Sequence, residues 1–307
     1  MALHTILGAG GAIGNALTAT LLADKAPVRS VSRTMRAGKG PFEQVSADLT
    51  DLAATIQAVQ GSSVVYLLVG LPYDIRIWSV QWPRIMSNVI EACKKQSARL
   101  IFFDNVYMYG LVQGPMTEET PFNPCSKKGE VRAKIARQLV DEMNAGKISA
   151  MIARSADFYG VGGERTNLTK GLVFDKLRSG KKAQWLCNAD TAHSLTYIQD
   201  AARALYMLAQ RDDAFGKTWH LPTAENPLTG RQFIAAAAAR LGGPSAVSVF
   251  PTWMMKGIGL VNRTIKEVVE MAYQNEYPYI FDSSRFNLAF RFTPTTYLDG
   301  INTICAG

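Results

Sequence analysis

The stretch TILGAGGAIGNAL, residues 5–17, runs from an apolar β-type segment through three regularly spaced glycines into a helical pattern. A glycine loop that follows a strand and opens a helix brings backbone N–H groups and the helix dipole to a pyrophosphate, and the missing Cβ atoms allow a close approach. A tight strand-to-helix turn without a ligand is the alternative. We expect this loop to bind a dinucleotide cofactor through Gly8, Gly11, Ala12, Ile13 and Gly14.

The first half of the chain alternates short β-type runs with longer helical patterns, which is typical of a parallel sheet covered by helices on both faces. The run VVYLLVG, residues 64–70, is continuously apolar, as expected for a strand buried on both faces. Strands are expected at 3–7, 28–32, 43–45, 64–69, 100–103 and 148–153, and helices at 12–23, 52–59, 78–95 and 127–144. The sequence therefore predicts an α/β fold built on a Rossmann-type doubly wound parallel sheet.

This alternation ends near residue 160. A helical stretch follows at 200–210, and a capping box of Thr229 and Gln232 opens another helix that Gly242 terminates. We predict a dinucleotide-binding Rossmann domain over residues 1–160, to which later strands and a helix near 190–222 return. Residues 161–307 are expected to form mainly a smaller C-terminal substrate-binding domain.

The composition limits the classes of partner. The 307 residues carry a formal net charge of +8, but the basic residues stand in scattered pairs, which indicates a mildly basic surface and no nucleic-acid groove. Four cysteines without a C-x-x-C pair favour free thiols in a reducing compartment over a metal site. No apolar run approaches the ~18 residues of a membrane span. We expect a cytoplasmic protein with a small-molecule substrate and without metal, nucleic-acid or membrane partners.

The end of the second expected strand indicates which dinucleotide binds. Ser32 and Arg33 stand where a carboxylate would otherwise hydrogen-bond a free ribose 2′-hydroxyl. An arginine can pair with a 2′-phosphate, which favours NADP(H) over NAD(H), and an arginine that is merely exposed is the alternative. Asp48, followed by Leu49, is a candidate adenine neighbour or a cap of the next helix. Leu68, at the end of the fourth strand, is expected to contact the cofactor.

Four segments carry a resemblance to a known family: GAGGAIG (8–14), LIFFDNVYMYG (100–110), MIARSADFYG (151–160) and HSLTYIQDAARAL (193–205). In order and spacing they resemble the short-chain dehydrogenase/reductase superfamily, in its extended or atypical NAD-dependent epimerase/dehydratase branch. The resemblance covers nearly the whole chain. It implies a bound nicotinamide cofactor, a C-terminal substrate domain and often a homodimer.

The chain departs from this family at the catalytic positions. By the resemblance, Asn105 stands where relatives carry a serine or threonine after the fifth strand. Relatives also carry Y-x-x-x-K, whereas none of the 11 tyrosines here has a lysine four residues later. In NPCSKKGE, residues 123–130, the tyrosine position falls on Asn123 if Lys127 is matched and on Pro124 if Lys128 is matched.

In such relatives the tyrosine exchanges a proton with the substrate oxygen, while the lysine lowers the pKa of the tyrosine and holds the nicotinamide ribose. By the resemblance, Lys127 or Lys128 can still bind the ribose, although a solvated helix start is an equal alternative. Asn105 can still offer an amide donor to a carbonyl oxygen.

Three residues are candidates for the missing proton donor. Tyr107 is the first choice, because it lies in the same loop as Asn105 and can approach the nicotinamide from the opposite side. Tyr109 is expected to pack within its Y-G turn. Cys125 would need a thiol tuned by the adjacent lysines, and a small buried side chain is the more common role of a lone cysteine.

The loop after the sixth strand adds Arg154, Asp157 and Tyr159 at the carboxyl edge of the sheet. By the resemblance this loop approaches the nicotinamide amide, and Asp157 is expected to contact the cofactor. His193 and Asp200 precede and open a helix, which favours a capping role. The segments VFPTWMMKG and EMAYQNEYPYIF suit an apolar or aromatic ligand, although such residues more often form core.

Three functions remain open. The first is an NADP(H)-dependent oxidoreductase that reduces a small carbonyl or unsaturated compound with an unusual proton donor. The second is a nucleotide-sugar epimerase or dehydratase, which the lost tyrosine weakens because the oxidation of a sugar hydroxyl needs a base. The third is a non-catalytic NADP(H)-binding sensor or regulator.

Overall fold

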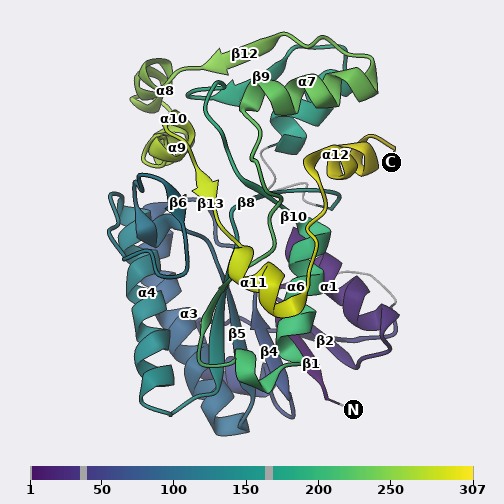
Figure 1. Cartoon of the computed structure of the whole chain (residues 1–307). Coiled ribbons are helices and arrows are strands. Elements are labelled where there is room, and N and C mark those ends of the chain that lie inside the picture. The colour runs from purple at the N-terminus through teal and green to yellow at the C-terminus, as the bar shows by residue number, and fades with distance from the viewer. Residues whose placement is uncertain (1, 35–39, 163–168, 307) are drawn as a thin grey trace.

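The computed structural model describes residues 2–34, 40–162 and 169–306. Within these ranges the centre is a seven-stranded sheet in the order β3-β2-β1-β4-β5-β7-β11, and each neighbouring pair is parallel (Figure 1). The strands are β1 (His4–Leu7), β2 (Val28–Ser32), β3 (Glu43–Ser46), β4 (Val64–Leu67), β5 (Arg99–Asp104), β7 (Ala150–Arg154) and β11 (Thr218–His220). The strand order reverses between β1 and β4, where such sheets open a ligand crevice at their carboxyl edge.

Helices cover both faces of this sheet (Figure 1). One face carries α1 (Ala12–Ala23) and α6 (Ile198–Ala209), and the other carries α2 (Leu52–Ala58), α3 (Ile75–Gln96) and α4 (Lys127–Asn144). Successive residues of β5 point to opposite faces, so that Leu100 joins the α3–α4 core and Ile101 joins the α1–α6 core. The predicted Rossmann-type doubly wound sheet is confirmed.

A further apolar core lies beyond the carboxyl edge of the large sheet, where Phe174, Trp185 and Phe233 pack together. Three two-stranded parallel sheets, β8–β10, β9–β12 and β6–β13, accompany the large sheet, and β9 and β12 contribute to this smaller core. Their strands are β6 (Pro115–Met116), β8 (Asp157–Tyr159), β9 (Ala183–Leu186), β10 (Leu195–Tyr197), β12 (Val247–Phe250) and β13 (Ile280–Phe281). The helices are α5 (Asp175–Arg178), α7 (Gly230–Leu241), α8 (Thr252–Gly259), α9 (Arg263–Val269), α10 (Tyr273–Glu276), α11 (Ser284–Phe290) and α12 (Tyr297–Ala306), with short turns at Tyr107–Tyr109, Lys170–Phe174 and Asp212–Ala214. The domain limit at residue 160 stays a prediction.

Local chemistry explains several element boundaries. The helices predicted at 12–23 and 127–144 have those bounds in the structure. Helix α3 begins at Ile75, before the predicted residue 78, because the Asp74 carboxylate accepts the Arg76 N–H at 2.9 Å and caps the helix. The predicted capping box of Thr229 and Gln232 is confirmed.

No helix within the described ranges is long and apolar enough to cross a bilayer. The same residues contain no group of three or more His, Cys, Asp or Glu that can hold a metal ion. All four cysteines are free thiols, of which Cys93 is buried and Cys125 is exposed.

Candidate functional site

The glycine loop joins β1 to α1 at the carboxyl edge of the sheet, beside the end of β4. Gly8 has a φ of +97°, and a Cβ there would lie 2.8 Å from backbone atoms of Leu68 and Val69. A Cβ on Gly14 would lie 2.9 Å from the Cα of Ala9. Neither position has room for a side chain, so both glycines are required by the packing of the loop itself.

Gly11 differs from these two glycines, because a Cβ there would meet only the Gly8 carbonyl oxygen at 3.6 Å, an ordinary contact. It is the N-cap of α1, which has no side-chain cap and no acidic residue in its first turn. Ala12 and Ile13 turn their side chains into the core at 7% and 4% exposure. A helix start that leaves its N–H groups without a side-chain cap beside an exposed glycine fits the pyrophosphate of a dinucleotide.

The end of β2 presents an exposed arginine. The Arg33 carbonyl accepts a hydrogen bond from the Ser46 hydroxyl at 3.0 Å, while its side chain extends to solvent. The Ser32 hydroxyl donates to the Thr34 carbonyl at 2.6 Å, so its proton is engaged in a hydrogen bond within the chain. Among the described residues, the Arg33 guanidinium is therefore the group at this strand end that suits a phosphate.

Asp48 lies near Arg33, at the turn that follows β3. Its carboxylate accepts the N–H and the hydroxyl of Thr50 at 2.9 and 2.8 Å, and these bonds lower the pKa of Asp48. The helix-cap alternative for Asp48 is wrong, because the carboxylate that caps α2 belongs to Asp51. Leu49 is buried at 6% exposure. The adenine contact of Asp48 and Leu49 stays a prediction.

The loop after β5 orients Asn105. Its side-chain Oδ1 accepts the Tyr107 N–H at 3.0 Å, and its own N–H donates to the Asp104 carboxylate at 2.9 Å. Because Oδ1 is occupied by a backbone donor, the amide Nδ2 is the half of this side chain that can donate to a ligand.

Tyr107 stands in the same loop as a half-buried phenol. Its ring stacks on Trp78 with ring centroids 6.2 Å apart, and its hydroxyl accepts from the Tyr73 hydroxyl at 3.5 Å. Burial, and next the negative charge of Asp157, raise the pKa of Tyr107 to about 12. A phenol in this environment stays protonated at neutral pH, so it can donate a proton but is a poor base.

A buried network of charged side chains stabilises the loop that follows β5. Arg132 Nε donates to the Asp104 carboxylate at 2.8 Å, and Arg154 Nε lies 3.7 Å from the same carboxylate. Arg154 Nη1 donates to the Tyr109 hydroxyl at 2.7 Å, and this hydroxyl contacts His220 Nε2 at 2.8 Å. Tyr109 is buried within this network, consistent with the packing role expected for it.

The structure separates the two lysines of NPCSKKGE. Lys128 is 0% exposed, and its ammonium pairs with Glu267 and with Glu270, the latter at 2.7 Å, while lying 4.7 Å from the centre of the Tyr73 ring. Lys127 is exposed and lines a cavity of about 530 Å³, together with Cys125 and residues of α9. The ammonium of Lys128 thus contacts α9 carboxylates, and Lys127 is the accessible candidate for a ribose. Both ribose roles stay predictions.

Asp157 and His193 form a pair that the sequence alone did not suggest. His193 Nε2 donates to the Asp157 carboxylate at 3.0 Å, and its ring stacks on Tyr279 at 4.4 Å. His193 is 4% exposed, whereas the Asp157 side chain is 36% exposed at the open edge. The histidine therefore orients a carboxylate that remains accessible.

The capping interpretation of His193 and Asp200 is wrong. The N-cap of α6 is Tyr197, and no side chain caps this helix. The Asp200 carboxylate instead accepts the N–H and hydroxyl of Thr295, at 2.6 and 3.0 Å. No local motif signals either contact, because the partners are 36 and 95 residues away.

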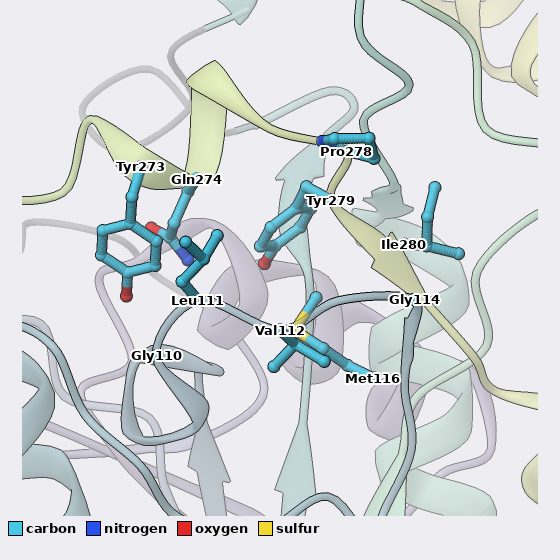
Figure 2. A pocket seen from close by; sticks show the side chains of 10 residues that line it. All are labelled: Gly110, Leu111, Val112, Gly114, Met116, Tyr273, Gln274, Pro278, Tyr279 and Ile280. Atoms are coloured by element: carbon cyan, nitrogen blue, oxygen red, sulfur yellow. The ribbon is translucent and has the colours of Figure 1, made fainter.

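Two of the three tyrosines of EMAYQNEYPYIF, Tyr273 and Tyr279, face the loop at 110–116 (Figure 2). Figure 2 shows Tyr273 and Tyr279 reaching toward Leu111 and Val112 around a cavity of about 10 Å³. A space of that size holds about one water molecule, so it cannot take a sugar. These two tyrosines join the C-terminal segment to the loop that directly follows the turn Tyr107–Tyr109.

The structure therefore brings most of the predicted residues to one edge of the sheet. The glycine loop, Leu68, Asn105, Tyr107 and Asp157 follow the carboxyl ends of β1, β4, β5 and β7. Sequence reasoning missed Tyr73 and Glu267, and it missed the contact of His193 with Asp157, because these contacts join residues distant in sequence.

Comparison with known proteins identifies the family of this chain. The family model described as the NAD dependent epimerase/dehydratase family matches residues 4–221. The dTDP-6-deoxy-L-talose 4-dehydrogenase (NAD(P)(+)) of Kitasatospora kifunensis is 28% identical over 192 residues, which cover 58% of this chain and 59% of that protein. The chain thus matches less than two thirds of the length of this curated relative.

Solved structures share the fold at low sequence identity. MoeE5 in complex with UDP-glucose and NAD has a TM-score of 0.80 at 19% identity, over 100% of this chain and 98% of that chain. DesIV, a dTDP-glucose 4,6-dehydratase from Streptomyces venezuelae with NAD bound, has a TM-score of 0.78 at 16% identity, over 99% and 96%. With the family match over residues 4–221, this chain belongs to the NAD dependent epimerase/dehydratase family.

Proposed function

We propose that the protein is an enzyme that binds a nicotinamide dinucleotide and uses it in redox chemistry on the sugar of a nucleotide sugar. The observation that carries the proposal is the open space at Gly11, at the start of α1, between two glycines that the packing requires. The nucleotide-sugar relatives support this reading better than they support a reductase of small carbonyl compounds.

The residues of the carboxyl edge fit such a cofactor. The N–H groups that begin α1 would hold the pyrophosphate, and the backbone of Leu68 would border the crevice between β1 and β4. When bound, the nicotinamide would give or take a hydride at the substrate carbon. NADP(H) is the expected form, because Arg33 is exposed at the end of β2 and can pair with a 2′-phosphate.

The proton chemistry favours reduction of a keto group over oxidation of a hydroxyl. The pKa of Tyr107, raised to about 12 by burial, keeps the phenol protonated, and a protonated donor serves the alkoxide that forms during reduction. Tyr73 donates to the Tyr107 oxygen, which leaves the Tyr107 proton free to be transferred. The Asn105 amide can donate to the same substrate oxygen.

The substrate would enter from the side of the smaller domain. The cavity of about 530 Å³ beside Lys127 is of a size that suits a sugar. Asp157, held by His193, offers an accessible carboxylate that can accept hydrogen bonds from sugar hydroxyls.

The direct test has two steps. Calorimetry with NADPH and NADH measures cofactor binding. Incubation with UDP-glucose, dTDP-glucose and dTDP-6-deoxy-L-talose, each with NADP⁺ or NAD⁺, and with the corresponding keto sugars and NADPH, then follows the nicotinamide absorbance, with products identified by mass spectrometry. Turnover of a nucleotide sugar supports the proposal. Tight cofactor binding without turnover of any sugar would favour the non-catalytic sensor, and no binding would refute both.

A further inference from the structure

Helix α8 and the turn that joins it to α9 carry three highly exposed apolar side chains. Trp253, Leu260 and Val261 are 73%, 88% and 91% exposed, and we call these three residues the tip face. Figure 1 shows α8 and α9 at one outer side of the smaller domain, with α8 at its margin. Other exposed apolar side chains among the described residues include Val80 and Leu288, at 66% and 80% exposure. A contiguous exposed apolar patch marks an interaction site more often than a single side chain does.

Contacts of α8 and α9 with the rest of the protein fix the orientation of the tip face. Met255 is buried, with its sulfur 3.9 Å from the Cys187 sulfur, so one side of α8 is anchored to the domain. Gly259 lets the two helices cross closely, because a Cβ there would lie 3.3 Å from the Cα of Lys266. Glu267 then ties α9 to α3 by accepting the Ile75 N–H at 3.1 Å. The exposure is therefore a property of an ordered element.

Positive charge accompanies the apolar residues. Trp253, Lys256 and Leu260 follow one another at the three- and four-residue spacing that places side chains on one side of a helix. Lys266, on α9, is exposed next to the helix crossing. Tryptophan and aliphatic side chains flanked by lysines are the composition of segments that lie in the interface of an anionic bilayer.

A second copy of the chain suits this face less well. A symmetric dimer would pair the same patch on both subunits and would bring the lysines of one copy toward those of the other. Juxtaposed like charges oppose such an interface, whereas anionic headgroups complement them.

We propose that the tip face docks the protein onto the surface of an anionic phospholipid bilayer, with the apolar side chains entering the headgroup region. The absence of a spanning helix in the described residues does not bear on this contact, because a surface contact needs no span. The three apolar residues of the tip face do not line the cavity of about 530 Å³, whereas Lys266 does, so the apolar contact is independent of the nucleotide-sugar function.

The chain contains its own reporter for the test. Of its five tryptophans, Trp78, Trp82, Trp185 and Trp219 are at most 7% exposed, so Trp253 is the one whose fluorescence can shift to the blue on transfer into lipid. We expect this shift, and co-sedimentation, with vesicles of phosphatidylcholine and phosphatidylglycerol. Pure phosphatidylcholine should bind at least about tenfold more weakly, and added salt should weaken the anionic binding.

Matched variants locate the contact. Leu260→Ser with Val261→Ser should lower vesicle binding by at least about tenfold, because two apolar side chains no longer enter the lipid. Lys256→Gln with Lys266→Gln should reduce the preference for anionic lipid. Leu288→Ser, an exposed leucine on α11, should bind as the unmodified chain does, and circular dichroism checks that each variant is folded.

Three results would overturn the proposal. One is equal binding to neutral and anionic vesicles, or no binding to either. Another is unchanged binding of the folded Leu260→Ser, Val261→Ser variant. The third is a blue shift that appears without vesicles and grows with protein concentration, since it would assign the tip face to self-association.

Discussion

The ammonium of Lys128, in the first turn of α4, is ion-paired with the carboxylate of Glu267 in α9, 139 residues further along the chain. Glu267 also accepts the Ile75 N–H at 3.1 Å, and Glu270 accepts the Lys128 N–H at 3.1 Å. Helix α9 therefore satisfies donors at the starts of both α3 and α4. Lys128, one of the two lysines expected from the resemblance to bind the ribose, joins the C-terminal region to the Rossmann sheet through these contacts.

This relationship predicts that Lys128→Met costs about 3–5 kcal/mol of unfolding free energy, because it leaves two carboxylates without their buried counter-ion. The neighbouring Lys127→Met, on an exposed side chain, should change stability by less than about 0.5 kcal/mol. Urea denaturation measures both. If the two variants are equally stable, the pairing of Lys128 with Glu267 and Glu270 does not contribute to stability. Cofactor titration of the folded variants then tests which lysine contributes to ribose binding.

Gly11→Val should abolish dinucleotide binding while the protein stays folded. A Cβ at Gly11 would lie 3.6 Å from its nearest neighbour, so the fold tolerates the added atoms. The same atoms would occupy the space that a pyrophosphate needs at the start of α1. Gly14→Val is the contrasting variant, since its Cβ would lie 2.9 Å from backbone and should destabilise the fold. Calorimetry and circular dichroism report the two properties. Undiminished binding by Gly11→Val would remove the loop from the site.

Arg33→Ala should erase most of any preference for NADPH over NADH. A charge-assisted hydrogen bond to the 2′-phosphate is worth about 1.5–3 kcal/mol, which is roughly one to two decades in affinity. The affinity for NADH, which lacks that phosphate, should change little. The measurement is a pair of titrations on each protein. Equal affinities of the unmodified protein for the two dinucleotides would count against the assignment of Arg33.

Tyr107→Phe should lower any turnover by about 10²-fold or more, the usual contribution of a positioned acid. Cys125→Ser should retain activity within about a few-fold, because an exposed thiol outside the β5 loop has no assigned proton to transfer. Steady-state rates on an identified substrate provide the comparison. A large loss in Cys125→Ser with an unaffected Tyr107→Phe would reverse the two assignments.

Two buried histidines, His4 and His220, should make the free energy of unfolding decrease at acidic pH. Burial lowers the pKa of His220 to about 3 and that of His4 to about 4, each from an ordinary value of 6.5. The unfolded chain therefore binds more protons below pH 6.5, so stability is fully present above that pH and falls as the pH drops toward 4. Each histidine contributes up to about 1.4 kcal/mol per pH unit.

The pH dependence of the denaturation midpoint checks this expectation. His220→Asn should be less stable at neutral pH, because its contacts with Tyr109 and with the Asp282 carbonyl are disturbed. Its stability should nevertheless fall less steeply between pH 6.5 and pH 4. An unchanged slope in His4→Asn and in His220→Asn would exclude these residues as its source.

The local sequence was sufficient to predict six of the seven strands of the large sheet, all except β11. The glycine loop, the bounds of α1 and α4 and the Thr229 capping box follow from interactions between residues close in sequence. Such interactions act whatever the rest of the chain does, so a pattern predicts them. The location of the site at the carboxyl edge could also be predicted, because parallel strands joined by helices have their carboxyl ends on one side of the sheet.

The roles of individual polar side chains were less predictable. Asp48 and Asp51 are both acidic residues before the same helix, and only the backbone path shows that Asp51 caps it. His193 lies just ahead of a helix, yet its partner is Asp157, which a parallel pairing of β8 and β10 brings beside it. The spacing of residues in the sequence does not show which distant loops lie side by side in the fold.

The sequence by itself determined that this chain forms a doubly wound sheet with a dinucleotide-type glycine loop, and that it lacks the tyrosine of Y-x-x-x-K. Only the tertiary structure decided that Lys128 is paired with α9, that Asp157 is held by His193, and that Tyr107 has a raised pKa. The physical reason is that helix periodicity and capping are local, whereas burial and ion pairing depend on which distant segments exclude water from a side chain.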